Sequence, residues 1–224
     1  MARQARYGAR WLLVHLALAW AALATAPTHA ARPLIWALGD SLTAGYGVLP
    51  QNGFTAQLQA ELRHRGVPAT VRNGGVSGDT TAQGRARLLW GLRGLGAKPD
   101  LVIVELGAND MLRGLPPEQA AANLDAILSE LRRRRIPILL AGMRAAPNLG
   151  PNYRRAFDTM YPRLAAAHGA RLYPFFLEGV AGNRSLLQAD GLHPNAQGVA
   201  LIVRRMLPSV TASLKVGPAA RAYP

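Results

Sequence analysis

The sequence predicts one α/β domain of three layers, in which a mostly parallel five-stranded sheet lies between two layers of helices. Short apolar runs alternate with longer amphipathic segments from about residue 33 to residue 210, and this alternation is typical of parallel strands joined by right-handed helical crossovers. Hydrophobic residues make up 50% of the 224 positions and charged residues 17%, the composition of a folded chain. No linker or internal repeat divides this stretch, so we expect a single domain over residues 31–214.

The first strands and helix follow from hydrophobic periodicity. Residues 33–38 form a short apolar run that ends at Gly39, as expected of a buried strand. Residues 53–65 are expected to form a helix that ends at Gly66. Its apolar side chains recur at four-residue steps and are Phe54, Leu58 and Leu62. We expect a second strand over residues 67–72.

The middle of the chain predicts two helices and a central strand. Residues 80–93 are expected to be helical, with an inner face made of Ala82, Ala86 and Leu89. Residues 101–104 are all apolar, as expected of a parallel strand covered on both faces. Two prolines and a glutamate at 116–118 suit the first turn of the next helix. The apolar stripe of this helix consists of Ala120, Leu124, Ile127, Leu128 and Leu131.

The last third of the chain continues the same alternation. Residues 136–141 predict a fourth buried strand, residues 152–168 a helix and residues 171–173 a short fifth strand. The final helix is expected over about residues 195–207, and its inward side chains are Val199, Ile202, Val203 and Met206. Residues 215–224 have no such pattern, so we expect them to form a flexible tail.

The first 30 residues have the features of a cleavable export signal. Residues 1–10 carry three arginines and no acid, and small residues precede Ala31 at the positions that a signal peptidase requires. Residues 11–24 are almost entirely apolar, but they are fewer than the roughly 20 residues that span a membrane. We therefore expect cleavage after Ala30 and a periplasmic or secreted protein. An uncleaved membrane anchor is the alternative.

The formal charge of +14 results from 26 Lys and Arg residues against 12 Asp and Glu residues. Such an excess makes a basic protein that binds nucleic acid or anionic membranes one hypothesis. The longest basic run, residues 132–135, follows an apolar helical stripe, where cations stabilise a helix C-terminus. The other arginines are scattered without interleaved aromatic residues. We therefore expect no nucleic-acid partner, whereas transient contact with an anionic membrane surface is compatible with the charge.

Several classes of site are excluded by residue usage. The chain contains no cysteine, so it has no disulfide, thiolate ligand or cysteine nucleophile. No His, Asp or Glu cluster has the spacing of a metal site. The glycine-rich segment 73–78 lacks the Gly-Lys-Ser/Thr ending of a phosphate-binding loop. We predict no metal and no cofactor, and we expect a monomer.

Polar residues are concentrated where the predicted strands end. Segment 39–42 (Gly-Asp-Ser-Leu) follows the first strand, segment 73–79 the second and segment 107–110 (Gly-Ala-Asn-Asp) the third, while segment 190–194 (Asp-Gly-Leu-His-Pro) precedes the last helix. Each segment alone is common as a turn or helix cap. Ligands of open parallel sheets bind beyond the carboxyl ends of the strands. We therefore expect a hydroxyl, a carboxamide and an imidazole to meet at one edge of the sheet.

The residue types in these segments suit nucleophilic catalysis. Ser41 lies at a strand-to-helix turn that can expose its hydroxyl, and a neutral serine needs a base to remove its proton. Histidine ordinarily titrates near neutral pH, so His193 is the candidate base. Asp190 precedes His193 by three residues, close enough in a tight loop to accept a hydrogen bond from the second ring nitrogen.

The four segments resemble, in order and spacing, the four sequence blocks of the GDSL, or SGNH, hydrolase superfamily. Further stretches at residues 38–46, 104–107, 112–114 and 161–165 are similar to its periplasmic thioesterase, lysophospholipase and arylesterase members. The resemblance covers about residues 33–210 and implies a flavodoxin-like SGNH hydrolase fold. It also implies hydrolysis of acyl esters or thioesters through an acyl-enzyme intermediate. The oxyanion donors that it implies are the N–H groups of Ser41 and Gly78 and the side-chain amide of Asn109.

Three aspartates beside these residues are expected to serve the loops. We interpret Asp40 and Asp110 as side chains that hold the loops around the site. Asp79 is expected to cap the helix that begins at residue 80.

Apolar residues near the predicted site suggest where an acyl group binds. The resemblance favours an acyl groove lined by Met111, Leu112, Met143 and Pro147, and ordinary packing at strand ends is the alternative. A small acyl ester or thioester is therefore the expected substrate. A carbohydrate deacetylase of the same superfamily is a second hypothesis, although such an enzyme would favour more than the 6% aromatic residues found in this chain.

Overall fold

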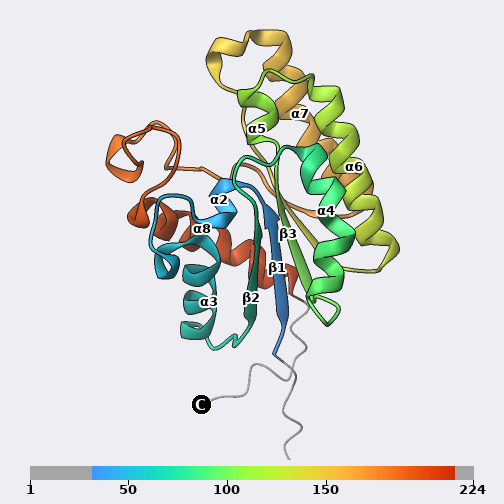
Figure 1. The fold of residues 1–224 in the computed structure, drawn as a ribbon, viewed down its shortest axis with the longest axis vertical. Helices are drawn as coiled ribbons and strands as arrows, with labels where there is room; N and C mark the ends of the chain where they lie inside the picture. The colour runs from blue at the N-terminus through green and yellow to red at the C-terminus, as the bar shows by residue number, and fades with distance from the viewer. Residues whose placement is uncertain (1–31, 215–224) are drawn as a thin grey trace, which may run out of the picture. The chain divides into compact units, whose positions relative to one another are not determined.

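The computed structural model describes residues 32–214, which form a five-stranded sheet between two helical layers (Figure 1). All four strand pairs are parallel, and the strand order is β2-β1-β3-β4-β5. The predicted fold class is confirmed. The predicted signal sequence over residues 1–30 and the predicted tail over residues 215–224 lie outside the described residues.

The strands occupy five short segments, and β2 begins three residues later than predicted. They are β1 (Leu34–Gly39), β2 (Thr70–Gly75), β3 (Leu101–Glu105), β4 (Ile138–Ala141) and β5 (Arg171–Tyr173). The strand β2 lies at the edge of the sheet and is half-exposed, so its sequence has no apolar run to mark its end. It continues through two glycines because a side chain on Gly74 would collide with Trp36, and one on Gly75 would collide with the backbone of Ala44.

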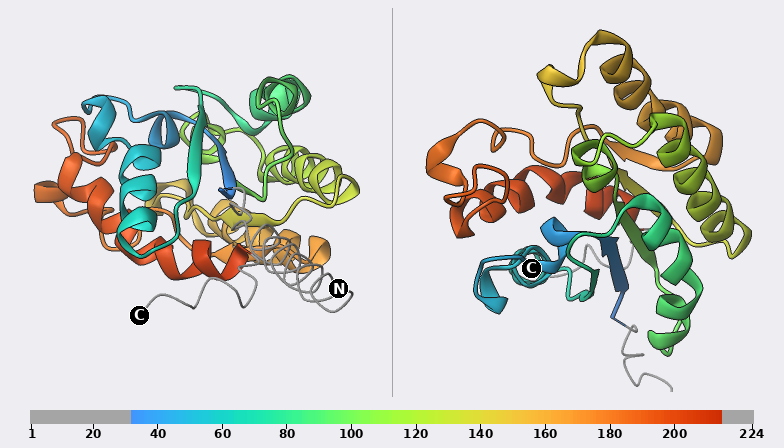
Figure 2. Two further views of the ribbon diagram at one scale, coloured as in Figure 1. Left: turned by 90° about the horizontal axis from the view of Figure 1, so that it is seen from below. Right: turned by 45° about the horizontal axis from the view of Figure 1, so that its top comes forward.

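Helices cover both faces of the sheet. The helices α3 and α8 pack together on one face, and α4, α6 and α7 cover the other (Figures 1 and 2). The α-helices are α2 (Ser41–Ala44), α3 (Phe54–His64), α4 (Thr81–Gly94), α5 (Ala108–Leu112), α6 (Pro117–Arg133), α7 (Pro151–His168) and α8 (Ala196–Ser213). Short 3₁₀ turns are η1 (Pro50–Asn52), η2 (Pro147–Leu149) and η3 (Arg184–Leu186).

The predicted inner face of α4 is wrong. The three residues expected to face inward, Ala82, Ala86 and Leu89, are exposed. The buried face consists of Thr81, Gly84 and Leu88. A side chain at Gly84 would collide with Leu106, so the missing side chain lets the helix lie close to the sheet. Because this face contains a glycine and a threonine, a search for recurring apolar residues does not identify it.

The last helix is longer than predicted. It passes through Pro208 and ends at Ser213, because Val210 is buried and continues the apolar face. The Thr211 hydroxyl donates to the carbonyl of Leu207 at 3.0 Å within the same turn. The expected inward side chains of α8 are buried, namely Val199, Ile202, Val203 and Met206.

The basic run at residues 132–135 lies at the end of α6, which leads into the amino end of β4. It is therefore at the opposite edge of the sheet from the carboxyl ends of the strands. Arg133 and Arg134 both pair with Glu130 one turn earlier. The run is a solvent-facing helix terminus. Within residues 32–214, no helix combines the length and apolar character that crossing a membrane requires.

Candidate active site

The site lies where the strand order changes direction, between β1 and β3. In open parallel sheets this point leaves a crevice beyond the carboxyl ends of the strands. Gly39 is the last residue of β1, and Ser41 begins the short helix α2. The carboxylate of Asp40 caps this helix by accepting from the N–H of Leu42 at 3.0 Å. Ser41 is thus placed on a sharp turn above the centre of the sheet.

A loop from the C-terminal part of the chain brings His193 to this turn. The loop has little regular structure, and an isolated bridge joins Leu187 to Pro194. Gln188 ties it to the Ser41 side of the site, because its amide donates to the carbonyl of Tyr46 at 2.8 Å and to that of Pro194 at 3.0 Å. The ring of Tyr46 packs against that of His193, with 4.6 Å between centroids.

Ser41, His193 and Asp190 lie in one line of hydrogen bonds. The Nε2 atom of His193 is 2.9 Å from the Oγ of Ser41, and its Nδ1 atom is 2.7 Å from Oδ2 of Asp190. The backbone N–H groups of His193 and Leu192 donate to Oδ1 of Asp190 at 3.0 and 2.9 Å. These two backbone bonds and the bond from the imidazole lower the pKa of Asp190 from 3.8 to about 2. Asp190 is therefore an anion at neutral pH.

The three expected oxyanion donors differ in whether they already make hydrogen bonds within the described residues. No hydrogen bond to another described residue is found for the N–H groups of Ser41 and Gly78. Gly78 has a φ of +86°, a conformation that favours glycine. The amide of Asn109 donates to Oδ2 of Asp40 at 3.1 Å and to the carbonyl of Asp79 at 3.0 Å. The carboxamide is therefore oriented before any ligand binds.

Asp110 and Asp79 connect the loops, but Asp79 does not cap α4. Asp110 accepts from the N–H and hydroxyl of Thr81 at 2.8 and 2.6 Å, which joins the short helix α5 after β3 to the start of α4. The cap of α4 is Thr80, which forms a capping box with Gln83. Asp79 instead pairs with Arg87.

Arg87 is a residue of the site that the sequence did not indicate. It projects from α4, is largely buried, and pairs with Asp79 at 2.5 Å. It also donates to the carbonyl of Gly74 at 2.7 Å and to that of Gly39 at 2.8 Å. One guanidinium thus joins the ends of β1 and β2 to the loop that carries Gly78. No sequence signal separates this arginine from the exposed arginines of the same helix.

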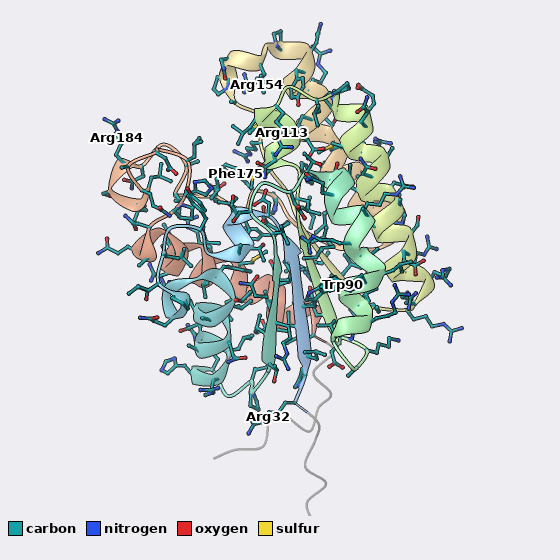
Figure 3. All side chains as sticks on the ribbon, viewed as in Figure 1. Arg32, Trp90, Arg113, Arg154, Phe175 and Arg184 are labelled. Carbon is teal, nitrogen blue, oxygen red and sulfur yellow. The ribbon has the colours of Figure 1, made fainter. Side chains whose placement is uncertain are left out.

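A pocket of about 430 Å³ opens beside Ser41. All four residues expected at an acyl groove line it, together with apolar residues that the sequence did not single out. The former are Met111, Leu112, Met143 and Pro147, and the latter include Tyr46, Phe175, Leu177 and Leu192. The apolar run at 174–177, directly after β5, is a signal that would have found two of them. Figure 3 shows Phe175 and Arg113 at this end of the molecule.

The described residues offer no ready metal site. Among residues 32–214, no group of three or more His, Asp or Glu side chains is arranged to hold a metal ion. The polar groups gathered at the Ser41 turn are a hydroxyl, an imidazole and N–H donors.

Sequence comparisons identify the family of the chain. The model of the GDSL-like Lipase/Acylhydrolase family matches residues 37–201. Esterase TesA of Pseudomonas aeruginosa is 42% identical over 173 residues, which are 77% of this chain and 85% of the relative. An arylesterase of Vibrio mimicus is 41% identical over 160 residues, 71% and 79% of the two chains. The Escherichia coli K12 thioesterase 1/protease 1/lysophospholipase L1 is 38% identical over 186 residues, 83% and 85% of the two chains.

Solved structures give the same result. The SGNH-hydrolase family esterase AlinE4 is 50% identical with a TM-score of 0.70, and the match covers 82% of this chain and 97% of AlinE4. The structure of TesA has a TM-score of 0.76 at 39% identity, covering 81% and 99% of the two chains. The chain therefore belongs to the GDSL-like lipase/acylhydrolase family and is a carboxylic ester hydrolase.

Proposed function

We propose that this enzyme hydrolyses esters and thioesters of small acyl groups through an acyl-enzyme formed on Ser41. One observation carries the assignment of residues: His193 lies 2.9 Å from Ser41 Oγ through Nε2 and 2.7 Å from Asp190 through Nδ1. Both distances are within the reach of a proton transfer or an orienting hydrogen bond. The same set recurs on unrelated folds as the machinery of acyl transfer.

Each member of the set then has a defined step. His193 Nε2 takes the proton of Ser41 as its Oγ attacks the acyl carbon, and the same proton passes to the leaving alcohol or thiol. The acyl-enzyme is hydrolysed when His193 activates a water molecule in the same way. Asp190 fixes the ring tautomer with the proton on Nδ1 and stabilises the imidazolium that forms at each step.

The charge that develops on the acyl oxygen needs donors fixed in advance. The N–H groups of Ser41 and Gly78 have no partner among the described residues, so both are available to an oxyanion. Asn109 would add its amide, and Asp40 sets the orientation of that amide. As the oxyanion forms, one of the two Asn109 N–H groups shares its hydrogen bond with the oxyanion, or turns to it from Asp40 or the Asp79 carbonyl.

The lining of the pocket favours an acyl or aryl group over a sugar. Thioether and aliphatic side chains dominate it, with only Tyr46 and Phe175 as aromatic rings. Among the relatives, one is named an arylesterase and another a thioesterase and lysophospholipase. A carbohydrate deacetylase would favour more aromatic side chains than these two for stacking on sugars.

A substrate panel tests the proposal. Acyl-CoA thioesters, p-nitrophenyl esters of increasing chain length, lysophospholipid and acetylated xylan are each offered to the wild type and to Ser41→Ala. We expect turnover of the esters and thioesters by the wild type only, with an unchanged circular dichroism spectrum for the variant. A phosphonate probe should label Ser41, since a related esterase, EstA from Pseudoalteromonas sp., is described as inhibited by monoethylphosphonate. Retained turnover in pure Ser41→Ala would refute the nucleophile.

We also propose that the rim of the pocket makes transient contact with anionic membrane surfaces. Of seven large hydrophobic side chains that are exposed within residues 32–214, three line the pocket: Tyr46, Leu112 and Leu192. Two more, Leu49 and Val76, lie close in sequence to lining residues, as does the exposed Arg113. Arg144 lines the pocket and stacks on Phe175 at 5.2 Å. Apolar groups with interspersed arginines suit the headgroup region of an anionic bilayer.

Vesicle sedimentation tests this surface. We expect binding to vesicles of phosphatidylglycerol and phosphatidylcholine that weakens with salt, and weaker binding after Leu112→Ser with Leu192→Ser. The matched control is Leu89→Ser with Trp90→Ser on α4, at a distance from the rim (Figure 3). Equal effects of both pairs, or binding that ignores salt, would contradict a contact made by the rim.

Export through a cleaved signal is the third part of the proposal. The basic start, short apolar segment and small residues before Ala31 support it. Cleavage there removes three arginines and no acid, so the formal charge falls from +14 to +11. N-terminal sequencing of exported protein is expected to begin at Ala31, and a start at Met1 would contradict cleavage.

A further inference from the structure

A fully buried glutamate without a positive partner lies beneath the Ser41 turn. Glu105 ends β3 in the centre of the sheet, where it is in register with Gly39 of β1. Its exposed fraction is 0%. No ion pair or hydrogen bond among residues 32–214 joins it to Lys, Arg or His, and its Oε1 atom has no hydrogen-bond partner. A carboxylate in such a place is strongly disfavoured.

The other oxygen of Glu105 contacts residues that precede and follow Ser41 in the sequence. Oε2 accepts from the hydroxyl of Thr43 at 2.8 Å and lies 3.4 Å from the N–H of Asp40. The carboxyl group lies against Gly39, since a side chain there would come within 2.6 Å of Oε2. The residues before and after the nucleophile are thus tied to the central strand through one atom.

The contacts also indicate which carboxyl group of the site carries a proton. Both oxygens of Asp40 accept hydrogen bonds, from the N–H of Leu42 and the amide of Asn109. Burial raises the pKa of Asp40 to about 6, so this group is an anion at neutral pH. In contrast, Oε1 of Glu105 accepts no hydrogen bond from the described residues, so this oxygen can carry a proton. The titratable groups facing Glu105 are Asp40 at the start of α2 and Tyr161 from α7, and neither is a cation. Burial, reinforced by Asp40, raises the pKa of Glu105 well above 4.5.

We propose that Glu105 is a neutral carboxylic acid that positions Ser41, by anchoring Asp40 and Thr43 through Oε2, and that it takes no part in proton transfer. It is a positioning residue that acts through the backbone of the turn. A neutral carboxyl group can accept these two hydrogen bonds without burying a charge. An ionised group would be repelled by the nearby Asp40 carboxylate.

Stability as a function of pH tests the protonation state. Because the folded protein binds a proton that the unfolded chain releases above pH 4.5, the Glu105 side chain destabilises the wild type increasingly as pH rises. Glu105→Gln keeps the shape and the acceptor without the proton. We expect its folding equilibrium constant, relative to the wild type, to rise between pH 5 and pH 8 by up to about tenfold per pH unit. Glu118→Gln, at an exposed glutamate, should give a flat difference.

Activity tests the positioning role. Glu105→Gln is expected to retain kcat and its pH profile, whereas Glu105→Leu, which leaves Thr43 and the Asp40 N–H without an acceptor, should lower kcat by about 10²-fold with KM changed little. Loss of kcat in Glu105→Gln with the fold intact would overturn the proposal, as would a stability difference that does not grow with pH. The infrared carbonyl band of a protonated carboxyl group at pH 8 checks the wild type directly, and its absence would also overturn the proposal.

Discussion

Asp190 accepts three hydrogen bonds from the His193 loop, two from the backbone and one from the imidazole. Asp190→Asn would keep the shape but present an amide N–H or a weaker acceptor to Nδ1, which favours the wrong ring tautomer. We expect kcat to fall by as much as about 10⁴-fold, as in other triads, with little change in KM. Steady-state kinetics on a p-nitrophenyl ester measure this, and near wild-type kcat would show that the imidazole needs no orienting carboxylate.

That carboxylate remains ionised through the neutral and mildly acidic range, because its pKa is held at about 2. Its contribution to folding is therefore present above pH 4 and is lost only as pH falls toward 2. Loss of activity between pH 4 and pH 7 accordingly arises from another group.

The proposed role of Asn109 as an oxyanion donor can be tested by removing its amide. Removing its amide in Asn109→Ala deletes one oxyanion donor and is expected to lower kcat by about 10²- to 10³-fold while KM changes little. Because the amide also bonds Asp40 and the Asp79 carbonyl, thermal unfolding must be measured alongside. A change confined to KM would argue for a substrate-binding role instead.

The residues of the site differ in how far the sequence reveals them. Ser41, Asn109 and His193 were predicted because each follows a strand or precedes a helix within a short polar segment. Arg87 and Glu105 were not, because their roles depend on acceptors from other parts of the chain. In the sequence Arg87 is one of many arginines, and Glu105 merely follows an apolar strand.

Arg87 makes α4 a brace for the two strands that end at the site. Arg87→Met removes the guanidinium and leaves Asp79 as a buried carboxylate without its partner. We expect a loss of about 3 kcal/mol in the free energy of unfolding and a fall in kcat larger than any change in KM. Urea unfolding and kinetics measure both quantities.

Arg85→Met is the matched control, since Arg85 is exposed on the same helix and, within residues 32–214, bonds only Asn123. It should leave stability and kcat nearly unchanged. Equal effects of the two substitutions would mean that the contacts of Arg87 with the strand ends are unimportant.

Two of the three glycines of α4, Gly84 and Gly94, should respond in opposite directions to alanine. Gly84→Ala collides with the packed Leu106 side chain and should destabilise the protein by about 1–3 kcal/mol. Gly94→Ala meets no atom within 4 Å and should be neutral or stabilising by up to about 1 kcal/mol. Thermal unfolding distinguishes them, and a stabilising Gly84→Ala would contradict the close packing of α4 on the sheet.

Helices and strands were predictable where apolar side chains do the packing. The stripe of α6 and the buried runs of β3 and β4 illustrate this. Prediction failed where packing depends on the absence of a side chain, as at Gly84 in α4 and at the two glycines that end β2. It also failed at Pro208, because a buried apolar face extends α8 past a residue that usually ends a helix.

The longest basic run of the chain lies away from the pocket. Residues 132–135 lie at the edge of the sheet opposite to the site, and two of these arginines pair with Glu130. Charge alone therefore suggested a nucleic-acid partner that the arrangement of the arginines does not support. The alternation of strands and helices, by contrast, determined both the fold class and the edge at which the site lies.

Ser41 and His193 are separated by 152 positions of sequence yet are joined by one hydrogen bond. The loop that carries His193 lies between β5 and α8, so its position depends on the placement of both elements. Denaturant should therefore abolish hydrolysis at or before the concentration at which tertiary structure is lost, and activity that outlasts the near-ultraviolet circular dichroism signal would contradict this dependence.

The same separation has a consequence in time. A chain that emerges from the ribosome, or is threaded through a membrane from its N-terminus, presents Ser41 long before His193 arrives. On the proposed mechanism the hydroxyl has no base during that interval, so we expect nascent chains to leave esters and thioesters intact until the segment with His193 has been made and has folded.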